Sequence, residues 1–347
     1  MTPPPPSQPT HQAPPAARQY DALTPQHVLD ALDTVGLRGD GRILQLNSYE
    51  NRVFQVFLED GRAVVAKFYR PGRWSDAQIV EEHGFALELA EAEVTVVPPL
   101  VLTADPDAAG LQLHGEPSTL ATWQRHRFTV AARCAGREPE LDDPATLRQL
   151  GRFLGRLHAV GRRQPFAHRH HMNAAIDGQR ALTLLREGGF VPPDQLPSWQ
   201  QASQTALHAV VAAFESAAPL NSLRLHGDCH PGNVLWRDGA PNVVDLDDAM
   251  QGPAVQDLWM LVSGDAGSMA QQFNVLLDGY EQFSDFDDRE RRLVEPLRTL
   301  RMLRHSAWLA ERWSDPTFPL NFPFFGSAAY WSQQTAQLRE QVELMAA

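Results

Sequence analysis

Two polar residues with types and spacing suited to phosphoryl transfer stand in the run HGDCHPGN at positions 226–233. Asp228 and Asn233 are five positions apart, as in the catalytic loop of kinases. There the carboxylate receives the proton of the acceptor hydroxyl, and the amide oxygen binds Mg²⁺. The protein does little covalent work in such a reaction, because its task is to position phosphates, neutralise their charge and orient the acceptor. The run therefore predicts a phosphotransferase with Asp228 as its catalytic carboxylate.

A second carboxylate follows at the end of a predicted β-hairpin. The apolar stretch 234–236, the turn signal at 238–239 and the stretch 243–245 are typical of two strands joined by a tight turn. The far strand ends in Asp245, so the hairpin is expected to place this carboxylate beside the metal. Asp245 is thus predicted to act in catalysis and, together with Asn233, to bind the metal ion.

Alternatives stay open for the polar residues of this region. Asp228 could instead be a turn aspartate that hydrogen-bonds its own backbone. His226 and His230 could be metal ligands, although their spacing matches no standard zinc pattern and a hydrogen-bonding role is favoured. Asp247 and Asp248 extend the acidic cluster either as metal contacts or as a solvated or helix-capping pair, so neither is included in the catalytic set.

A lysine is predicted inside an apolar strand. Lys67 lies in the run AVVAKFY at 63–69, where an ammonium is unfavourable unless it meets an anion such as a nucleotide phosphate. Glu82 falls on the inward face of the helix that follows, where it can hold Lys67 as an ion pair, as in kinases. Glu81 is the rival for this pairing, and two solvated surface glutamates are the remaining alternative.

The segment 46–54 is expected to cover the nucleotide, yet it contains no glycine. Backbone amides or the Ser48 hydroxyl could contact phosphate there, and an ordinary polar hairpin is the alternative. Neither GxGxxG nor GxxxxGK[ST] occurs in the chain, which counts against a Rossmann or P-loop enzyme. The predicted cofactor-binding residues are therefore Ser48, Lys67 and Glu82, with ATP and Mg²⁺ as the cofactors.

The elements that must position these residues are strands in the first part of the chain and helices in the second. Apolar spacing predicts a leading helix at 21–37 and, after a cap at Ser75, a helix to residue 90. Strands are expected at 43–58, 63–69, 94–102, 111–113 and 128–132. Helix-compatible patterns then cover 144–161, 177–186, 199–217, 255–262, 270–283, 288–312 and 328–345.

This order predicts an α+β, bilobal protein-kinase-like fold. Residues 19–136 are expected to form a nucleotide-binding N-lobe with an antiparallel sheet and a helix, and residues 137–347 a mainly helical, catalytic C-lobe. The proline-rich residues 1–18 are expected to be a disordered tail, because they carry too few apolar side chains to offset the entropy cost of ordering.

Composition limits the class of protein. The chain has 347 residues, of which 43% are hydrophobic, so it can build the core of an enzyme-sized protein. A formal net charge of −12 argues against a general nucleic-acid binder. Cys134 and Cys229 lack disulfide or zinc spacing, and no apolar run approaches the ~18 residues of a membrane span. Without the features of a signal peptide at 1–17, a cytoplasmic protein outside the membrane is expected, and we take it as a monomer.

Cations alternate with aromatic residues near the C-terminus. The cations are Arg301, Arg304, His305 and Arg312, and the aromatic residues are Trp308, Trp313, Phe318, Phe322, Phe324 and Phe325. They form either a substrate surface or, as is commoner for such sets, lobe packing with a polar rim.

Several motifs together resemble those of known kinases. LGRLH at 154–158, HGDCHPGN, and GP at 252–253 with DL at 257–258 resemble the aminoglycoside phosphotransferase and choline kinase superfamily. A closer resemblance links nearly the whole chain to the stress response kinase A family of bacterial serine/threonine protein kinases. It rests on LNSYENRV at 46–53, KFYRP at 67–71, LWRDG at 235–239, VDLDDA at 244–249 and GPAVQDLWML at 252–261.

The resemblance implies residue roles and a reaction. Matched by position, Asp228 would be the proton acceptor, and Asn233 and Asp245 would be the magnesium ligands. Lys67 would bind phosphate, Ser48 would contact ATP, and Asp257 would brace the catalytic loop. It implies ATP as donor and serine or threonine hydroxyls of proteins as acceptors, with autophosphorylation allowed and a role in the stress response.

Two other functions stay open at this point. A small-molecule kinase of the aminoglycoside, choline or homoserine type would need a concave acidic pocket in the helical lobe. A non-catalytic nucleotide-binding regulator is suggested by the absence of glycine in the segment around Ser48.

Overall fold

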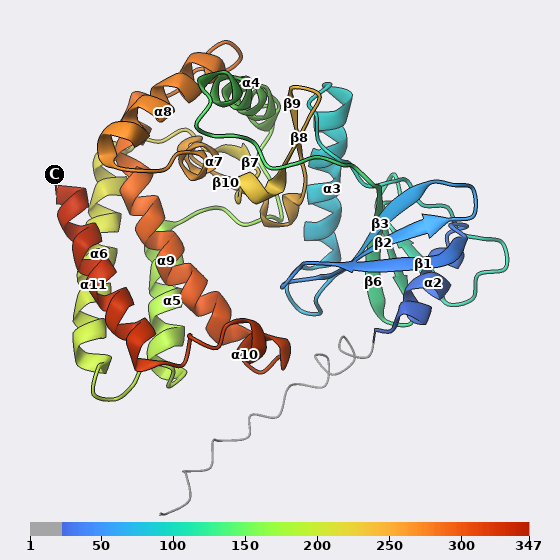
Figure 1. The fold of residues 1–347 in the computed structure, drawn as a ribbon, viewed down its shortest axis with the longest axis horizontal. Helices are drawn as coiled ribbons and strands as arrows, with labels where there is room; N and C mark the ends of the chain where they lie inside the picture. The colour runs from blue at the N-terminus through green and yellow to red at the C-terminus, as the bar shows by residue number, and fades with distance from the viewer. Residues whose placement is uncertain (1–22, 347) are drawn as a thin grey trace, which may run out of the picture.

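The structure is a computed structural model that describes residues 23–346. Two lobes lie side by side, with the sheet-containing N-terminal lobe on the right of Figure 1 and the helices of the C-terminal lobe on the left. The α+β, bilobal fold predicted from the sequence is confirmed. The predicted tail at 1–18 lies outside the described residues.

A six-stranded antiparallel sheet forms the N-terminal lobe, in the order β1-β2-β3-β6-β5-β4. Its strands are β1 (Gly39–Leu46), β2 (Arg52–Leu58), β3 (Ala63–Phe68), β4 (Leu111–His114), β5 (Leu120–Trp123) and β6 (His126–Ala132). Alternation along β3 buries Val64, Ala66 and Phe68 against helix α2 (Pro25–Asp33). The same alternation turns Lys67 to the opposite face of the sheet.

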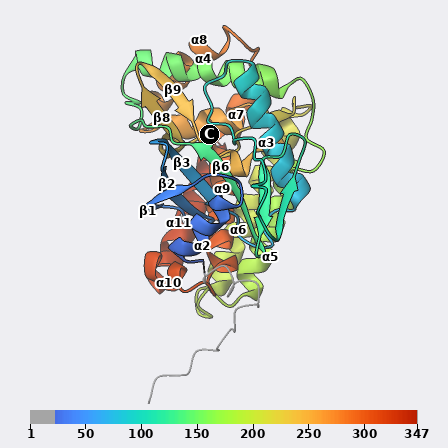
Figure 2. The same ribbon diagram turned by 90° about the vertical axis from the view of Figure 1, so that its right-hand side faces the viewer.

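Helix α3 (Asp76–Glu91) stands between the sheet and the C-terminal lobe in Figure 1, and Figure 2 shows it to one side of strands β1, β2 and β3. It begins at Ser75, whose side chain and that of Gln78 form a capping box. Ile79 packs in a small apolar cluster beneath the sheet, whereas Phe85 and Leu89 belong to the main core of the C-terminal lobe. Because one helix contributes to both cores, its inward residues have a defined position relative to both lobes.

The prediction of a strand at 94–102 is wrong. This segment forms only isolated bridges, Val96 with Val243 and Pro99 with Ala131. The proline pair at 98–99 cannot donate backbone hydrogen bonds, so a continuous ladder is excluded. The segment instead divides its pairing between the two lobes.

The C-terminal lobe is mainly helical. Its helices are α4 (Pro144–Gly161), α5 (Ala174–Glu187), α6 (Leu196–Ala217), α7 (Val255–Leu258), α8 (Ala266–Tyr280), α9 (Val294–Glu311), α10 (Thr317–Asn321) and α11 (Ala328–Ala346). Four 3₁₀ turns, η1 (Pro231–Asn233), η2 (Leu246–Asp248), η3 (Trp259–Leu261) and η4 (Asp288–Leu293), lie between them. Two small sheets pair β7 (Leu223–Leu225) with β10 (Met250–Gly252) and β8 (Val234–Arg237) with β9 (Ala240–Val243).

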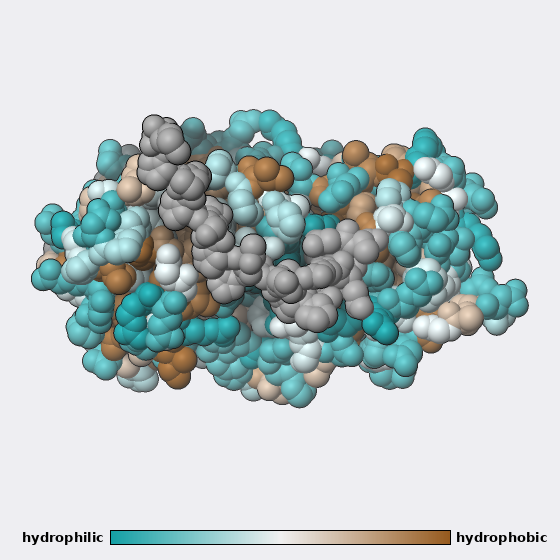
Figure 3. Space-filling model, turned by 90° about the horizontal axis from the view of Figure 1, so that it is seen from below, coloured by the Kyte–Doolittle hydropathy of each residue, from teal (hydrophilic) through white to brown (hydrophobic). Residues whose placement is uncertain are grey.

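The sequence located the long helices and the β8–β9 hairpin, and it missed the short strands β5, β7 and β10 and the short helix α10. Strand β5 is a third partner between β4 and β6, and the five-residue α10 lies in the aromatic segment. Among residues 23–346, no helix has both the length and the apolar composition required to cross a membrane. The face seen in Figure 3 is mainly hydrophilic, with its hydrophobic residues in smaller separate groups.

Helices α4 and α8 approach closely enough to require glycine at their contact. A Cβ on Gly151 would lie 1.9 Å from the carbonyl oxygen of Leu276, and one on Gly279 would lie 2.0 Å from that of Arg148. Backbone atoms cannot move aside as the end of a flexible side chain can. This contact fixes α4, which carries His158 toward the active site.

We expect Gly151→Ala to lower the free energy of unfolding by about 1–3 kcal/mol, because the added methyl group forces α4 and α8 apart. Urea denaturation at neutral pH measures the loss. Gly84→Ala is the matched control, since a Cβ at this helical position meets no atom within 4 Å. The control is expected to be neutral or more stable by up to about 1 kcal/mol. Equal stability of the two variants would contradict the close approach.

Candidate active site

A cleft of about 850 Å³ lies between the lobes and is lined by residues of both. It brings together every site residue predicted from the sequence, namely Ser48, Lys67, Glu82, Asp228, Asn233 and Asp245. These residues come from the sheet, from α3 and from the β7–β9 region, so only the assembled pair of lobes places them near one another.

The buried Asp257 holds the backbone of the segment that carries Asp228. The two carboxylate oxygens of Asp257 accept the backbone N–H groups of His226 and Gly227, each at 2.8 Å. His158 Nε2 lies 3.0 Å from the same carboxylate, and His158 Nδ1 lies 2.9 Å from the Tyr280 hydroxyl. Burial raises the pKa of Asp257, but the hydrogen bond and charge of His158 outweigh it, so the pKa lies below its ordinary value. The bracing contact that the resemblance implied is present.

His226 connects this segment to the metal side of the cleft. Its Nε2 lies 3.0 Å from the Val244 carbonyl oxygen, and its Nδ1 accepts the Asp228 backbone N–H at 3.3 Å. These contacts assign the ring proton to Nε2. Both ring nitrogens are thereby used in hydrogen bonds, which is the scaffold role favoured from the sequence. The described residues contain no group of three His, Cys, Asp or Glu side chains placed to hold a metal ion.

Asn233 and Asp245 supply oxygen donors across the hairpin. Asn233 Nδ2 donates to the backbone carbonyl oxygen of Asp228 at 3.0 Å, and the backbone carbonyl oxygen of Asn233 accepts the Val244 N–H at 3.0 Å, so the side-chain oxygen of Asn233 is left for a metal ion. Asp245 follows β9 in the left-handed region, with φ 63° and ψ 61°, which is uncommon for a residue other than glycine. An amide oxygen and a half-exposed carboxylate suit a small hard cation whose remaining ligands are phosphate and water.

The prediction that Lys67 forms an ion pair with Glu82 is wrong. Lys67 Nζ lies 3.0 Å from Asp245 Oδ1 and 3.8 Å from Asp247 Oδ1, and no contact within 4.0 Å joins it to Glu82 in the described part of the chain. Glu82 does point inward as predicted, and it is buried in the cleft wall. Burial raises the pKa of Glu82 to about 7 against the attraction of Lys67 and Arg169, so a neutral carboxyl competes poorly for the ammonium.

Glu81, the rival for Lys67, has a different task. Its carboxylate accepts the backbone N–H groups of Ala167, His168 and Arg169 at 2.5, 2.8 and 2.7 Å. The loop fixed in this way directs the Arg169 guanidinium to the carbonyl oxygens of Ala249 and Asp247, at 2.8 and 2.5 Å. Glu81 therefore acts on the loop beneath the acidic cluster.

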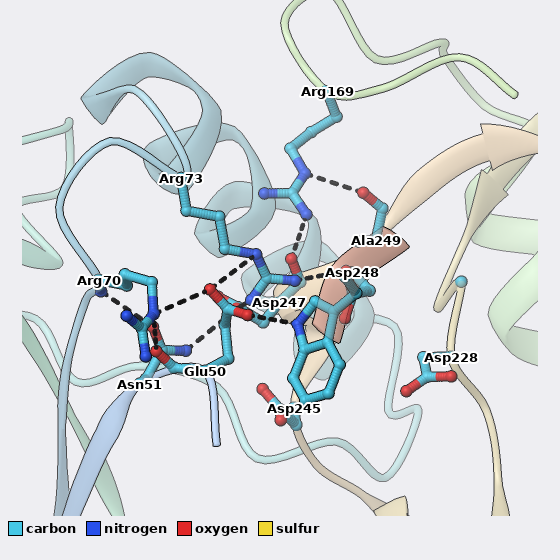
Figure 4. A network of polar contacts seen from close by, with 12 residues as sticks. Glu50, Asn51, Arg70, Arg73, Arg169, Asp228, Asp245, Asp247, Asp248 and Ala249 are labelled. Carbon is cyan, nitrogen blue, oxygen red and sulfur yellow. Dashed lines mark hydrogen bonds and ion pairs between the residues drawn. The ribbon is translucent and has the colours of Figure 1, made fainter. Parts of the chain in front are cut away.

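Asp247 is the centre of a network that the sequence left undecided (Figure 4). Asn51 Nδ2 donates to its carboxylate at 3.0 Å, and Arg73 binds both Asp247 and Asp248. Burial raises the pKa of Asp247, but Lys67, Arg73 and Arg169 outweigh it and hold the pKa at about 2. Asp247 is thus a charged, buried anchor for residues of the N-terminal lobe.

Side chains hold the segment over the cleft in place of glycine. The Glu50 carboxylate accepts from Arg312 Nε at 2.6 Å and from Trp308 Nε1 at 2.7 Å, and the Tyr49 ring packs on Phe322 with centroids 4.8 Å apart. Inside the segment, Ser48 Oγ accepts the backbone N–H of Asn51 at 3.3 Å. The segment 47–51 is therefore ordered by contacts with α9 and the α10 region, which no local motif could reveal.

Helix α9 forms the wall of the cleft beside Asp228. Residues three or four positions apart face the cleft, and they include Leu297, Leu300, Arg301, Arg304, His305 and Trp308. Arg301 Nη1 makes an ion pair with Asp228 Oδ1. In the set of basic and aromatic residues near the C-terminus, Phe318 and Phe325 are buried packing residues, as the packing interpretation expects, whereas Phe322 lines the cleft.

The chain is similar in sequence to known proteins over most of its length. Residues 42–294 match the sequence model of APH, the phosphotransferase enzyme family. Stress response kinase A of Escherichia coli K12 is 41% identical over 330 residues, which cover 95% of this chain and 96% of that protein. The serine/threonine protein kinase RdoA of Salmonella typhimurium LT2 is 41% identical over 94% of this chain and 94% of its own length.

Solved structures agree on the fold. Amicoumacin kinase hAmiN, in complex with AMP-PNP, Ca²⁺ and Ami, covers 94% of this chain and 95% of its own, with a TM-score of 0.68 and 18% identity. The microcompartment-associated aminopropanol kinase covers 92% and 98%, with a TM-score of 0.65 and 17% identity. Fold and cleft together define a phosphotransferase of the kinase type. Within that class, the chain belongs to the APH phosphotransferase family and to its stress response kinase A branch.

The raised pKa of Glu82 predicts a pH-dependent effect on stability. Between pH 4.5 and about 7 the folded state binds this proton more tightly than the unfolded state, so rising pH destabilises the wild type through this group. Glu82→Gln lacks the proton and should gain stability relative to the wild type across this window. Urea denaturation from pH 5 to 8 measures the difference. Glu91→Gln, at the exposed end of the same helix, is the control, and a relative loss of stability by Glu82→Gln with rising pH would contradict the assignment.

The contact between Glu50 and Arg312 predicts that α9 controls the order of the segment above the cleft. In Arg312→Ala we expect amide hydrogen exchange at 47–51 to accelerate about tenfold, since losing charge-assisted hydrogen bonds costs about 1.4 kcal/mol or more. Arg180→Ala is the matched control, because within residues 23–346 its exposed guanidinium pairs only with Glu311, at 3.3 Å. Equal exchange at 47–51 in both variants would show that this contact does not order the segment.

Proposed function

We propose that this protein is an ATP- and Mg²⁺-dependent serine/threonine protein kinase that acts in a stress response. The observation that carries the proposal is the convergence of Asp228, Asn233, Asp245 and Lys67 in one interlobe cleft. Support for a protein acceptor comes from the 41% identity to RdoA, named a serine/threonine protein kinase, and support for the stress role from stress response kinase A.

The nucleotide would lie across the cleft from its apolar to its charged end. Val65, Pro99, Ala131 and Leu235 offer apolar surface for a purine ring. We expect Lys67 to contact the phosphates and Ser48 to lie close to them, because both residues line the cleft. That the solved relative hAmiN holds AMP-PNP and Ca²⁺ in the same fold supports a nucleotide and a divalent cation here.

Asn233 and Asp245 would hold Mg²⁺. When bound, the ion would neutralise phosphate charge and orient the transferred group. The chain's own contribution is Asp228, which accepts the proton of the acceptor hydroxyl. Asp257 keeps Asp228 in position through the two backbone N–H groups that it binds. Both the carboxylate and its support are fixed before substrates arrive, which reduces the cost of reorganisation.

The charge of the cleft wall favours this function over the small-molecule alternative. An aminoglycoside, choline or amino alcohol carries positive charge, and α9 presents the guanidinium groups of Arg301 and Arg304 to the cleft. The kinases of small molecules with the same fold are less than 20% identical, so their acceptors are no guide to the acceptor of this chain. A non-catalytic regulator is disfavoured because the carboxylate, the metal donors and the lysine are all present in the cleft. We further propose that the protein is a cytoplasmic monomer.

We expect purified protein with ATP and Mg²⁺ to place phosphate on serine or threonine, either of itself or of a generic acceptor protein. Asp228→Ala should reduce transfer by about 10²–10⁴-fold without abolishing nucleotide binding, because it removes the proton acceptor. Asp245→Ala should weaken Mg²⁺-dependent nucleotide binding. Phosphosite mass spectrometry and γ-labelled ATP supply the measurements.

Asp278→Ala is the matched control, since it removes an exposed carboxylate from α8. Wild-type turnover in Asp228→Ala would overturn the catalytic assignment. Transfer to aminoglycosides or amino alcohols, with none to protein, would establish the alternative function.

A further inference from the structure

The wall beside Asp228 carries positive charge that the reaction described above does not use. Arg304 is half-buried in the cleft wall and, within residues 23–346, makes no hydrogen bond or ion pair shorter than 4.0 Å. The carboxylate that attracts it, Asp248, is already bound by Arg73. An arginine stays charged at all accessible pH values, so Arg304 presents an uncompensated cation to the cleft.

Asp228 pairs with Arg301 of this wall, and two further carboxylates of the cleft have partners outside the wall. Asp247 is bound by Arg73 and Asn51, and Asp245 is bound by Lys67. His305 stands between Arg301 and Trp308 on the same face of α9, and its ring stacks on Trp308 with centroids 5.6 Å apart. Burial and the neighbouring Arg301 lower the pKa of His305, so the uncompensated charge of the wall is that of Arg304, in a chain whose formal net charge is −12.

Arg301 links the positive wall to the catalytic carboxylate. Its guanidinium makes an ion pair with Asp228 Oδ1, while Asp228 Oδ2 lies 3.6 Å from His230 Nε2. The guanidinium thus takes up one of the two carboxylate oxygens that can accept a hydrogen bond from an acceptor hydroxyl. An acceptor that offers Arg301 a second anion could draw it away from Asp228, because guanidinium binds carboxylate and phosphate in two-point contacts.

We propose that Arg301 and Arg304 form a subsite for a negatively charged side chain next to the acceptor hydroxyl, so that the preferred substrate is an acidic peptide segment. The inference rests on the proposed protein kinase function. Arg301 moves from Asp228 to the carboxylate of the substrate, and this exchange frees Asp228 to accept the hydroxyl proton. Since Arg301 contacts Asp228 directly, the acidic residue lies within a few positions of the phosphorylated serine or threonine.

Peptides with one serine acceptor and flanking Glu, Gln or Lys residues test the subsite. We expect the wild-type protein to phosphorylate the Glu peptide with a kcat/KM at least about tenfold above that of the Gln peptide, which corresponds to one good charged contact. In Arg304→Gln the ratio should fall to about 2 or less, mainly through KM for the peptide. Arg304→Glu should reverse the order and favour the Lys peptide.

Arg298→Ala is the matched control on the same helix, because Arg298 pairs with Glu295 at 3.1 Å and is not among the residues that line the cleft. It should keep the wild-type preference for the Glu peptide. Arg301→Lys, which retains the charge but loses the two-point contact, should keep part of the preference.

The outcomes separate the inference from the function on which it rests. Equal phosphorylation of the three peptides by the wild type, or a preference that Arg304→Glu leaves intact, would overturn the acidic subsite while leaving the protein kinase function standing. A higher KM for ATP in Arg304→Gln, with unchanged peptide preference, would place Arg304 on the nucleotide and also overturn it. Nucleotide binding without transfer to any peptide or protein would overturn the proposed function itself, and the subsite with it.

Discussion

The buried carboxylate of Asp257 is the constraint on which the active site depends. It gathers the backbone N–H groups of His226 and Gly227 and the ring of His158 around one charge that has no access to water. Unpaired, each of these groups would carry a desolvation penalty, so the set forms together. The glycine contacts between α4 and α8 serve the same end, because α4 brings His158 to Asp257. The position of Asp228 follows from this arrangement.

Local patterns in the sequence were sufficient for much of this site. The spacing of Asp228 and Asn233, the hairpin that ends in Asp245 and the alternation that turns Lys67 away from the core are all short-range features. The long helices were located for the same reason, because the recurrence of apolar residues every 3.6 positions can be recognised within one segment of the sequence. The sequence therefore predicted the bilobal fold and the residues that meet in the cleft.

Contacts between distant segments could not be predicted in this way. Arg73 meets Asp247 across 174 positions, and Glu50 meets Arg312 across 262. The predicted partner of Lys67, Glu82, was wrong for the same reason. Asp245 and Asp247, which follow β9, reach the ammonium group, while burial favours the neutral form of Glu82. Short-range patterns specify where a charged side chain points, but its partner depends on the competition among all charges that the fold brings near it.

The segment at 47–51 has a consequence for how the two lobes can be recombined. A glycine-rich loop carries its shape in its own backbone and can be moved with the sheet that holds it. Here the shape of the segment depends on contacts with Arg312, Trp308 and Phe322, which belong to the other lobe. An N-terminal lobe grafted onto the helical lobe of a more distant kinase would keep its sheet and lose the order of this segment. The unit of exchange between such proteins is therefore the sheet together with α9 and the α10 region.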